Sequence, residues 1–201
     1  MDMTAVDLPI TFEFENVQAL AAGEVIALLP CADLARADVL DVLPDNSVNV
    51  LPFTEIIEHL TFNPVAFWRQ IYRVLAPQGR IVITTANYYA WNGRAWNIKR
   101  FVTGFGGGLS VDEVLGDHTY GHHWREFSRL ELIRYFCLLS PDFVTVKAKT
   151  KTTRDYYAPD SRSWRRRLGR GLEAFASLRP NLHLEIELVE KRHGIVIEPQ
   201  W

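Results

Sequence analysis

The stretch 67–87, FWRQIYRVLAPQGRIVITTAN, decides the fold class of this chain. Its first half predicts a helix, because Asn63 can cap the start, Pro64 suits the first turn and apolar side chains recur at helical spacing. Pro77 ends the helix and Gly79 permits a left-handed exit. RIVITT then predicts a strand in the middle of a parallel sheet, since it is apolar on both faces. The predicted apolar helix face comprises Phe67, Ile71, Val74 and Leu75.

Strand and helix also alternate upstream of this unit. Residues 3–8 and 47–57 are apolar runs that predict buried strands, and residues 37–43 predict a short strand that ends in acids. Residues 16–29 favour a helix by composition.

A helix and two strands are predicted downstream. Ser128 and Glu131 form a capping box for a helix that ends at Pro141. Residues 143–152 and 182–189 alternate apolar and polar side chains, which predicts two strands with one polar face each. The apolar positions expected on one face are Leu130, Ile133, Cys137 and Leu138 in the helix, Val144, Val146 and Ala148 in the first strand, and Leu184, Ile186 and Leu188 in the second.

The element order predicts an α/β fold. We expect a Rossmann-like, doubly wound sheet with an antiparallel C-terminal edge, formed by a single domain that spans residues 1–201. Residues 87–124 are rich in Gly, Asn, Trp and Tyr and predict a lid or substrate loop. Ligands of such sheets bind beyond the carboxyl ends of the strands, so the residues that follow strands are the first site candidates: Asp7, Asp38, Glu55 and Asn87.

Composition narrows the class of protein. The chain has 201 residues, 48% of them hydrophobic and 23% charged, which is typical of a globular domain and not of a disordered chain. A net charge of -2 gives no overall attraction to DNA. No apolar stretch is long enough to form a transmembrane segment. Cys31 and Cys137 have no metal-ligand spacing, and we expect two buried thiols in a cytoplasmic protein.

Four phrases, taken together, resemble the class I S-adenosylmethionine-dependent methyltransferases of small-molecule type. They are TAVDLP, ADVLDVLPDNSVNVLPFTEIIEHL, FWRQIYRVLAPQGRIVITTAN and GHHWREFSRLEL. The resemblance implies S-adenosylmethionine as cofactor, with Asp7 on the ribose hydroxyls, Asp38 near the adenine amino group and Val39 against the ring. Asp41 competes with Asp38 for its role. The full set of implied cofactor-binding residues is Asp7, Leu8, Asp38, Val39 and Glu55.

The chain departs from the family pattern at two places. The family's first strand and its Gly-x-Gly loop would precede TAVDLP, so we expect an N-terminally incomplete fold that begins at the second strand. The glycines at 106–108 do not replace that loop, because they follow no predicted strand and open no helix. Val48 and Asn49 stand where the family usually has Phe-Asp. No acid at this position can therefore take the role of the family's Asp.

Histidines are the candidate catalytic residues. The resemblance places Glu55 and His59 at the floor of the pocket, and a neutral imidazole can accept a proton from an oxygen or nitrogen acceptor near neutral pH. The candidates are His59, His122 and His123, each with a purely structural role as the alternative. Asp117 and His118 join the last two in DHTYGHHWRE, but their spacing is unspecific, so we predict a lid loop and no metal.

The acceptor is expected to meet an aromatic loop and one arginine. The predicted substrate-binding residues are Asn87, Tyr88, Trp91 and Arg125, and packing of the lid onto the body is the alternative for the aromatic ones. The basic segment from Arg162 to Arg170 could make a weak contact with an anionic surface, although a solvated helix face is favoured. A homodimer is compatible with the sequence.

We therefore predict a methyltransferase that acts on a small-molecule, sugar or lipid-like acceptor. The alternative is a truncated or degenerate methyltransferase-like domain that persists as a binding or interaction module. A dinucleotide oxidoreductase shares the sheet but has less support, because the glycine fingerprint is absent from these residues.

Overall fold

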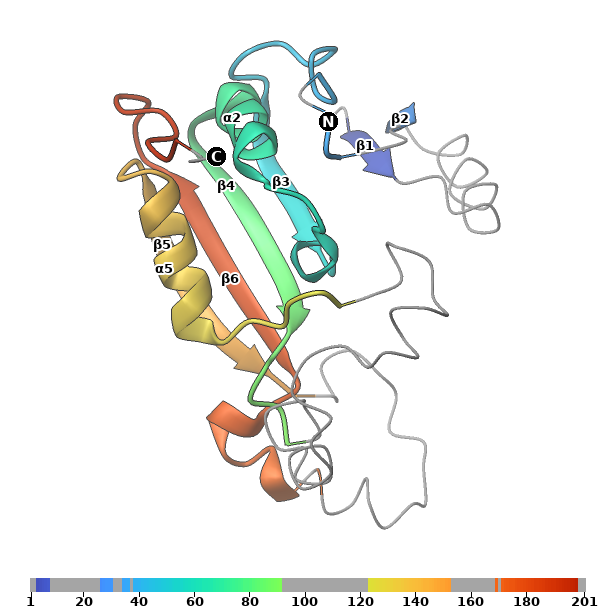
Figure 1. Ribbon diagram of the computed structural model, residues 1–201, viewed down its shortest axis with the longest axis vertical. Helices are drawn as coiled ribbons and strands as arrows, with labels where there is room; N and C mark the ends of the chain where they lie inside the picture. The colour runs from blue at the N-terminus through green and yellow to red at the C-terminus, as the bar shows by residue number, and fades with distance from the viewer. Residues whose placement is uncertain are drawn as a thin grey trace.

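The computed structural model describes residues 3–7, 26–30, 34–36, 38–91, 123–152, 169 and 171–198. Helices and strands follow one another along these residues as drawn in Figure 1. Their bounds are β1 Met3–Asp7, β2 Ile26–Pro30, β3 Val48–Thr54, the 3-10 helix η1 Ile57–His59, α2 Val65–Val74, β4 Leu75–Ala86, α5 Arg129–Leu139, β5 Phe143–Lys151, the 3-10 helix η5 Ala176–Leu178 and β6 Asn181–Leu188.

The main sheet has four strands in the order β3-β4-β6-β5. Strand β3 runs parallel to β4, and β6 runs antiparallel to both β4 and β5. The predicted α/β class and the antiparallel C-terminal edge are thus confirmed. The prediction that RIVITT is flanked by parallel strands on both sides is wrong, because β6 pairs antiparallel with β4.

A second, two-stranded sheet joins β1 and β2 in parallel. In the described part of the chain, β1 and β3 belong to different sheets and no described strand joins them. Residues 26–30 form strand β2, so the helix predicted over 16–29 is wrong there, and the rest of that prediction lies outside the described residues.

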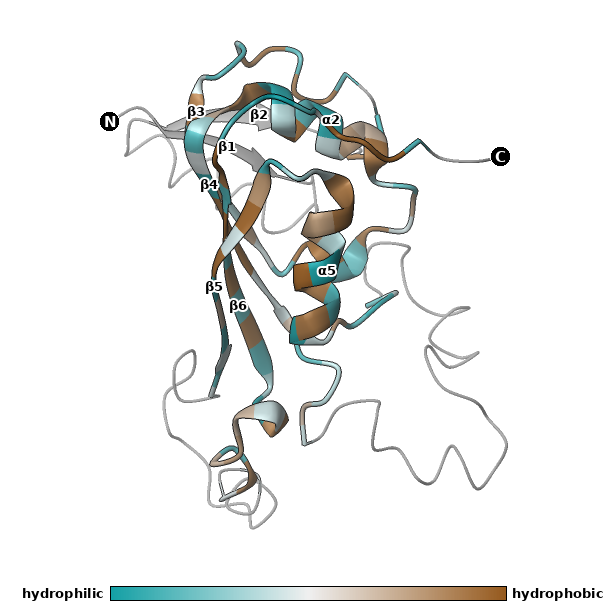
Figure 2. Ribbon diagram, turned by 90° about the vertical axis from the view of Figure 1, so that its left-hand side faces the viewer, coloured by the Kyte–Doolittle hydropathy of each residue, from teal (hydrophilic) through white to brown (hydrophobic). Residues whose placement is uncertain are grey.

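The core lies between the main sheet and one helical layer. Figure 2 shows α2 and α5 on the same side of the sheet, and both helices bury apolar side chains, among them Trp68 and Phe136. The two helices meet where the indole nitrogen Nε1 of Trp68 donates a hydrogen bond of 2.6 Å to the hydroxyl of Tyr135. Phe136 contacts Trp68 with 5.1 Å between ring centroids. No helix among the described residues is long and apolar enough to cross a membrane.

The predicted apolar face of α2 is confirmed, because Phe67, Ile71, Val74 and Leu75 are all buried. Strand β6 is likewise confirmed, with its apolar residues fully buried at every second position. Strand β5 is different: Val144 and Val146 remain 44% and 45% exposed. Apolar and polar residues therefore alternate along β5, but Val144 and Val146 do not face the core.

The apolar face predicted for α5 is wrong, although its capping box is confirmed. The buried residues are Leu132, Phe136 and Leu139, one turn apart from each other. Leu130 and Leu138 are exposed, and so is the thiol-bearing Cys137. Cys31, the other predicted buried thiol, lies outside the described residues.

Two local predictions also fail for backbone reasons. Asp38 and its neighbours form turns and not a strand, with amide-to-carbonyl bonds such as Asp41 to Asp38 at 3.0 Å. The left-handed residue after α2 is Gln78, with φ of 64°, and not Gly79. Gly79 is needed for another reason, since a Cβ there would stand 2.7 Å from the carbonyl oxygen of Ala76.

Candidate functional site

The candidate site lies where the parallel strands β3 and β4 end. Glu55 directly follows β3, and its amide donates a 2.8 Å hydrogen bond to the carbonyl of Thr84 in β4. Glu55 adopts a left-handed backbone with φ of 52°, which is uncommon for a residue with a side chain. This turn redirects the chain into η1, which carries Glu58 and His59 over the strand ends.

Glu58 is a fully buried carboxylate. Its Oε2 accepts a 2.8 Å hydrogen bond from the Thr85 hydroxyl, whereas Oε1 receives none from the described residues. Burial raises the pKa of Glu58 to about 7, and the nearby Glu55 carboxylate contributes to the rise. The side chain therefore changes its charge near neutral pH in the absence of a ligand.

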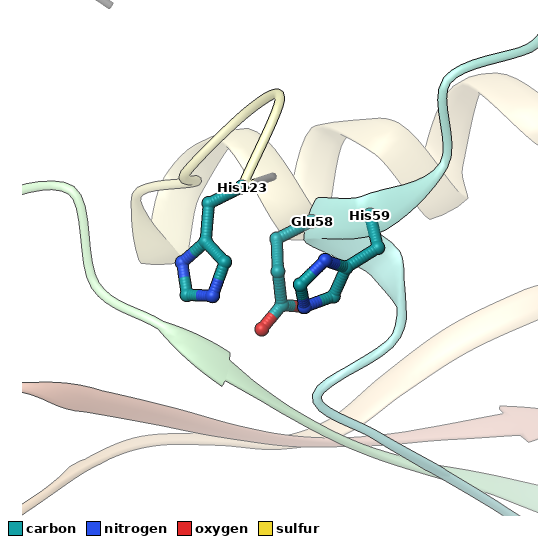
Figure 3. A group of neighbouring side chains, drawn as sticks. All are labelled: Glu58, His59 and His123. Atoms are coloured by element: carbon teal, nitrogen blue, oxygen red, sulfur yellow. The ribbon is translucent and has the colours of Figure 1, made fainter. Parts of the chain in front are cut away.

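Two imidazoles stand beside this carboxylate. The ring centroids of His59 and His123 are 4.7 Å apart and the rings are nearly perpendicular, at 88°. One ligand atom from each of Glu58, His59 and His123 lies within 4.8 Å of the other two. Figure 3 shows the three side chains pointing toward one another.

The segment that carries His123 is attached to the strand ends by its backbone. The Arg125 amide donates to the Glu58 carbonyl at 3.4 Å, and Tyr88 donates to the Phe127 carbonyl at 3.0 Å. Asn87 and Phe127 form an isolated parallel bridge. These contacts place His123 next to η1 although the two segments are distant in sequence.

A cavity of about 540 Å³ adjoins the same two segments. Its wall combines apolar side chains with charged ones at the rim, among them Ile57, Leu60, Phe62, Arg125, Phe127 and Glu131. Arg125 lies over the Phe127 ring at 5.4 Å and forms a 2.9 Å ion pair with Glu131. Hydrogen bonds from Ser128 and this arginine hold the pKa of Glu131 below its usual range, against the opposing effect of burial.

The chain is similar to known proteins both in sequence and in fold. Residues 4–83 match the protein family described as methyltransferase domain. Among solved structures, a complex between the Haloferax volcanii Trm112 methyltransferase activator and a methyltransferase is 14% identical, with a TM-score of 0.53 over 95% of this chain and 85% of that one. Residues 4–83 thus match the methyltransferase-domain family, and the chain shares its fold with solved methyltransferases.

Other similar structures share this methyltransferase fold. The plantazolicin methyltransferase BamL, solved with a substrate analogue and S-adenosylhomocysteine, is 12% identical, with a TM-score of 0.54 over 94% of this chain and 69% of that one. A methyltransferase from Mesorhizobium loti is 17% identical, with a TM-score of 0.52 over 92% and 80% of the two chains. No curated protein matches the chain in sequence.

The predicted catalytic residues of the methyltransferase domain fall partly into the described site. His59 and His123 are brought together there, and Glu55 stands beside them. His122 lies outside the described residues. Glu58 and Thr85 were not among the predicted site residues, although the Glu-His pair in EIIEHL was the available signal for Glu58.

The predicted substrate residues occupy different environments. Asn87 is buried and donates to the carbonyls of Ser177 and Arg179 at 3.0 and 2.7 Å. Tyr88 is 38% exposed, and Trp91 lies against Gly169, where a Cβ would stand 2.3 Å from its ring. Their binding roles, and that of Arg125, stay predictions.

The structure describes only some of the predicted cofactor-binding residues. Asp7 is the last residue of β1, and Leu8 lies outside the described residues. Asp38 is exposed and pairs with Arg36 through both carboxylate oxygens, at 2.9 and 2.7 Å. This arginine lowers the pKa of Asp38 below its ordinary value. Val39 is half-buried beside the core.

Proposed function

We propose that this chain transfers a methyl group from S-adenosylmethionine to a small-molecule, sugar or lipid-like acceptor. The observation that supports this role is the Glu58, His59 and His123 cluster at the carboxyl ends of β3 and β4. Ligands of open α/β sheets bind at that edge. The cluster supplies groups that can orient an acceptor and take up its proton.

The residues at the strand ends fit the cofactor chemically. Asp7 ends β1 and Glu55 follows β3, so a carboxylate-bearing residue occupies the end of a parallel strand in each sheet. A carboxylate offers two acceptor oxygens, which suits the pair of hydroxyls on a ribose. We propose that Asp7, Leu8, Asp38, Val39 and Glu55 bind the nucleoside and methionine portions, with Asp38 exchanging its Arg36 contact for the adenine.

The chain's own residues would control the acceptor's proton. When bound, S-adenosylmethionine supplies a methyl group already activated on a sulfonium. A ring nitrogen of His123 or His59 accepts the proton of an acceptor hydroxyl or amine as its heteroatom becomes nucleophilic. The Glu58 carboxylate, held by Thr85, lies beside both rings and would pair with an imidazole that has taken up the acceptor's proton.

The acceptor's apolar part would meet aromatic side chains. Tyr88 and Tyr89 lie at the end of β4, and their ring centroids are 5.2 Å apart. Both are partly exposed, at 38% and 45%. Exposed aromatic faces are suited to sugar rings and aliphatic chains, and Arg125 supplies a cation at the same end of the sheet.

Calorimetry with S-adenosylhomocysteine tests the cofactor assignment. The full chain should bind one equivalent, and Asp7→Asn should weaken binding about 10-fold or more because a charged hydrogen-bond acceptor is lost. Glu198→Gln is the matched control, since Glu198 is exposed and pairs only with Arg69 among its described partners. Absence of any binding by the full chain would refute the proposed function.

Transfer of a labelled methyl group tests the acceptor class. Incubation of the chain and labelled S-adenosylmethionine with a small-molecule extract should place label in that fraction, and His123→Gln should reduce the rate. Label found only in added nucleic acid or protein would contradict a small-molecule acceptor.

A further inference from the structure

The cluster beside β3 and β4 has the composition of a metal site. Glu58, His59 and His123 present one oxygen and two nitrogen donors, and these atoms all lie within 4.8 Å of one another. Donors bound to one ion at about 2.1 Å in a tetrahedral shell are about 3.4 Å apart. The donor atoms are therefore at most about 1.4 Å farther apart than in such a shell.

The carboxylate in this cluster lacks a partner that its burial requires. Glu58 is fully buried, yet its Oε1 receives no hydrogen bond from the described residues. A buried charge is stable only when it is paired, hydrogen-bonded or bound to a metal ion. No Arg or Lys among the described residues pairs with Glu58, so its Oε1 is open to a cation from solution.

The surroundings hold the donors in place before any ion arrives. The Thr85 hydroxyl holds the Glu58 carboxylate through Oε2 and leaves Oε1 without a hydrogen bond. The amide of Arg125 ties the His123 segment to the Glu58 carbonyl at 3.4 Å. Hydrogen bonds of this kind to ligand residues are a regular feature of metal sites.

A second carboxylate adds negative charge. Glu55 directly follows β3, three residues before Glu58, and holds the left-handed backbone that starts the turn into η1. Local strain of this type is retained where it serves a site.

We propose that Glu58, His59 and His123 bind one divalent first-row transition-metal ion, with Zn²⁺ or Mn²⁺ as representative cations. Two imidazoles favour such ions over Mg²⁺ and Ca²⁺, which prefer shells made of oxygen. Three protein donors leave at least one coordination position for water or for an oxygen of a substrate. In the loaded site the two imidazoles are ligands, so the proton-accepting role proposed for them above applies to the metal-free chain.

The test uses the full chain without an affinity tag, stripped of metal by a chelator that is then removed. Titration with ZnCl₂ alone in a calorimeter should show one site of micromolar or tighter affinity, and MgCl₂ should bind at least about 100-fold more weakly. Co²⁺ should give visible absorption bands that report nitrogen and oxygen ligation. Neither readout needs S-adenosylmethionine, so failure here is distinct from failure of methyl transfer.

Variants locate the site. His123→Asn and Glu58→Gln should each weaken zinc binding about 100-fold and remove the cobalt bands. His183→Gln is the control, because His183 is a half-buried histidine of β6 that contacts Glu185 and lies outside the cluster. Circular dichroism verifies folding, and His123→Asn changes a partly exposed residue outside any helix or strand. Binding that is only millimolar, or that survives His123→Asn unchanged, would overturn the inference.

Discussion

The Glu58 carboxylate and the His123 imidazole lie within 4.8 Å of each other, although one belongs to η1 and the other to the segment before α5. Backbone hydrogen bonds at the end of β4 produce this proximity, since Tyr88 binds the Phe127 carbonyl and Arg125 binds the Glu58 carbonyl. The site therefore depends on the strand ends as much as on its own side chains.

Thr85 should act as a positioning residue for Glu58. Its hydroxyl donates to Oε2 at 2.8 Å, so Thr85→Val removes the only described side-chain donor to that carboxylate. We expect zinc affinity to fall about 10-fold, the usual effect of losing a partner of a ligand residue. Thr85→Ser should retain the affinity, because it keeps the hydroxyl. Equal affinity in the valine and wild-type chains would show that Thr85 does not orient Glu58.

The contact between α2 and α5 depends on Tyr135. Tyr135→Phe leaves the buried Trp68 indole N–H without its 2.6 Å acceptor, which should lower the free energy of unfolding by about 1 to 3 kcal/mol. Chemical denaturation measures this change. Tyr88→Phe is the control, since Tyr88 is 38% exposed and its change should stay within about 0.5 kcal/mol. Equal stability of the two variants would contradict the role of Tyr135.

Asp142 should make the free energy of unfolding depend on pH under acidic conditions. Burial alone would raise the pKa of Asp142, but hydrogen bonds from His193, Tyr72 and backbone amides lower it far below its usual range. An acid with a lowered pKa stabilises the fold above its ordinary value of 3.8, and this contribution is lost as the pH falls below that value.

Asp142→Asn tests this dependence. At pH 7 we expect the free energy of unfolding to fall by about 2 to 3 kcal/mol, because hydrogen bonds to a charged group are replaced by weaker ones. The difference from wild type should shrink on acidification below pH 3.8. Asp38→Asn, at an exposed ion pair, should change stability by less than about 1 kcal/mol. A difference that is constant with pH would contradict the role of the ionised carboxylate.

Gly79 should not tolerate a side chain. Its Cβ in Gly79→Ala would stand 2.7 Å from the Ala76 carbonyl oxygen and 3.0 Å from Leu75 Cγ, so the backbone must shift. We expect a loss of about 1 to 3 kcal/mol in thermal or chemical unfolding. Gly171→Ala is the matched control, because nothing lies within 4 Å of the added atom. Equal effects at the two positions would show that contact with the Ala76 carbonyl is not the cause.

The local elements were predictable where residues close together in the sequence carry the signal. The α2 face, the Ser128 and Glu131 capping box and the alternation of β6 all follow from short-range periodicity and local hydrogen bonding. The same reasoning failed for α5 and β5, because Cys137, Leu138 and Val144 are apolar but lie on faces that the core does not cover. Periodicity defines a face, and packing decides which face is buried.

The site was predictable only in part for a similar reason. His59 and His123 were candidates by residue type, since imidazoles titrate near neutral pH. Glu58 was not, although the Glu-His pair in EIIEHL was a signal, because its full burial beside Thr85 of β4 depends on a contact distant in sequence.

By itself the sequence determined the α/β class, the antiparallel C-terminal edge and the resemblance to methyltransferases, because these depend on the order and periodicity of short segments. The tertiary structure alone decided that Glu58, His59 and His123 share one site. Their proximity arises from the pairing of strands and the docking of a distant segment, which are long-range contacts that local patterns do not encode.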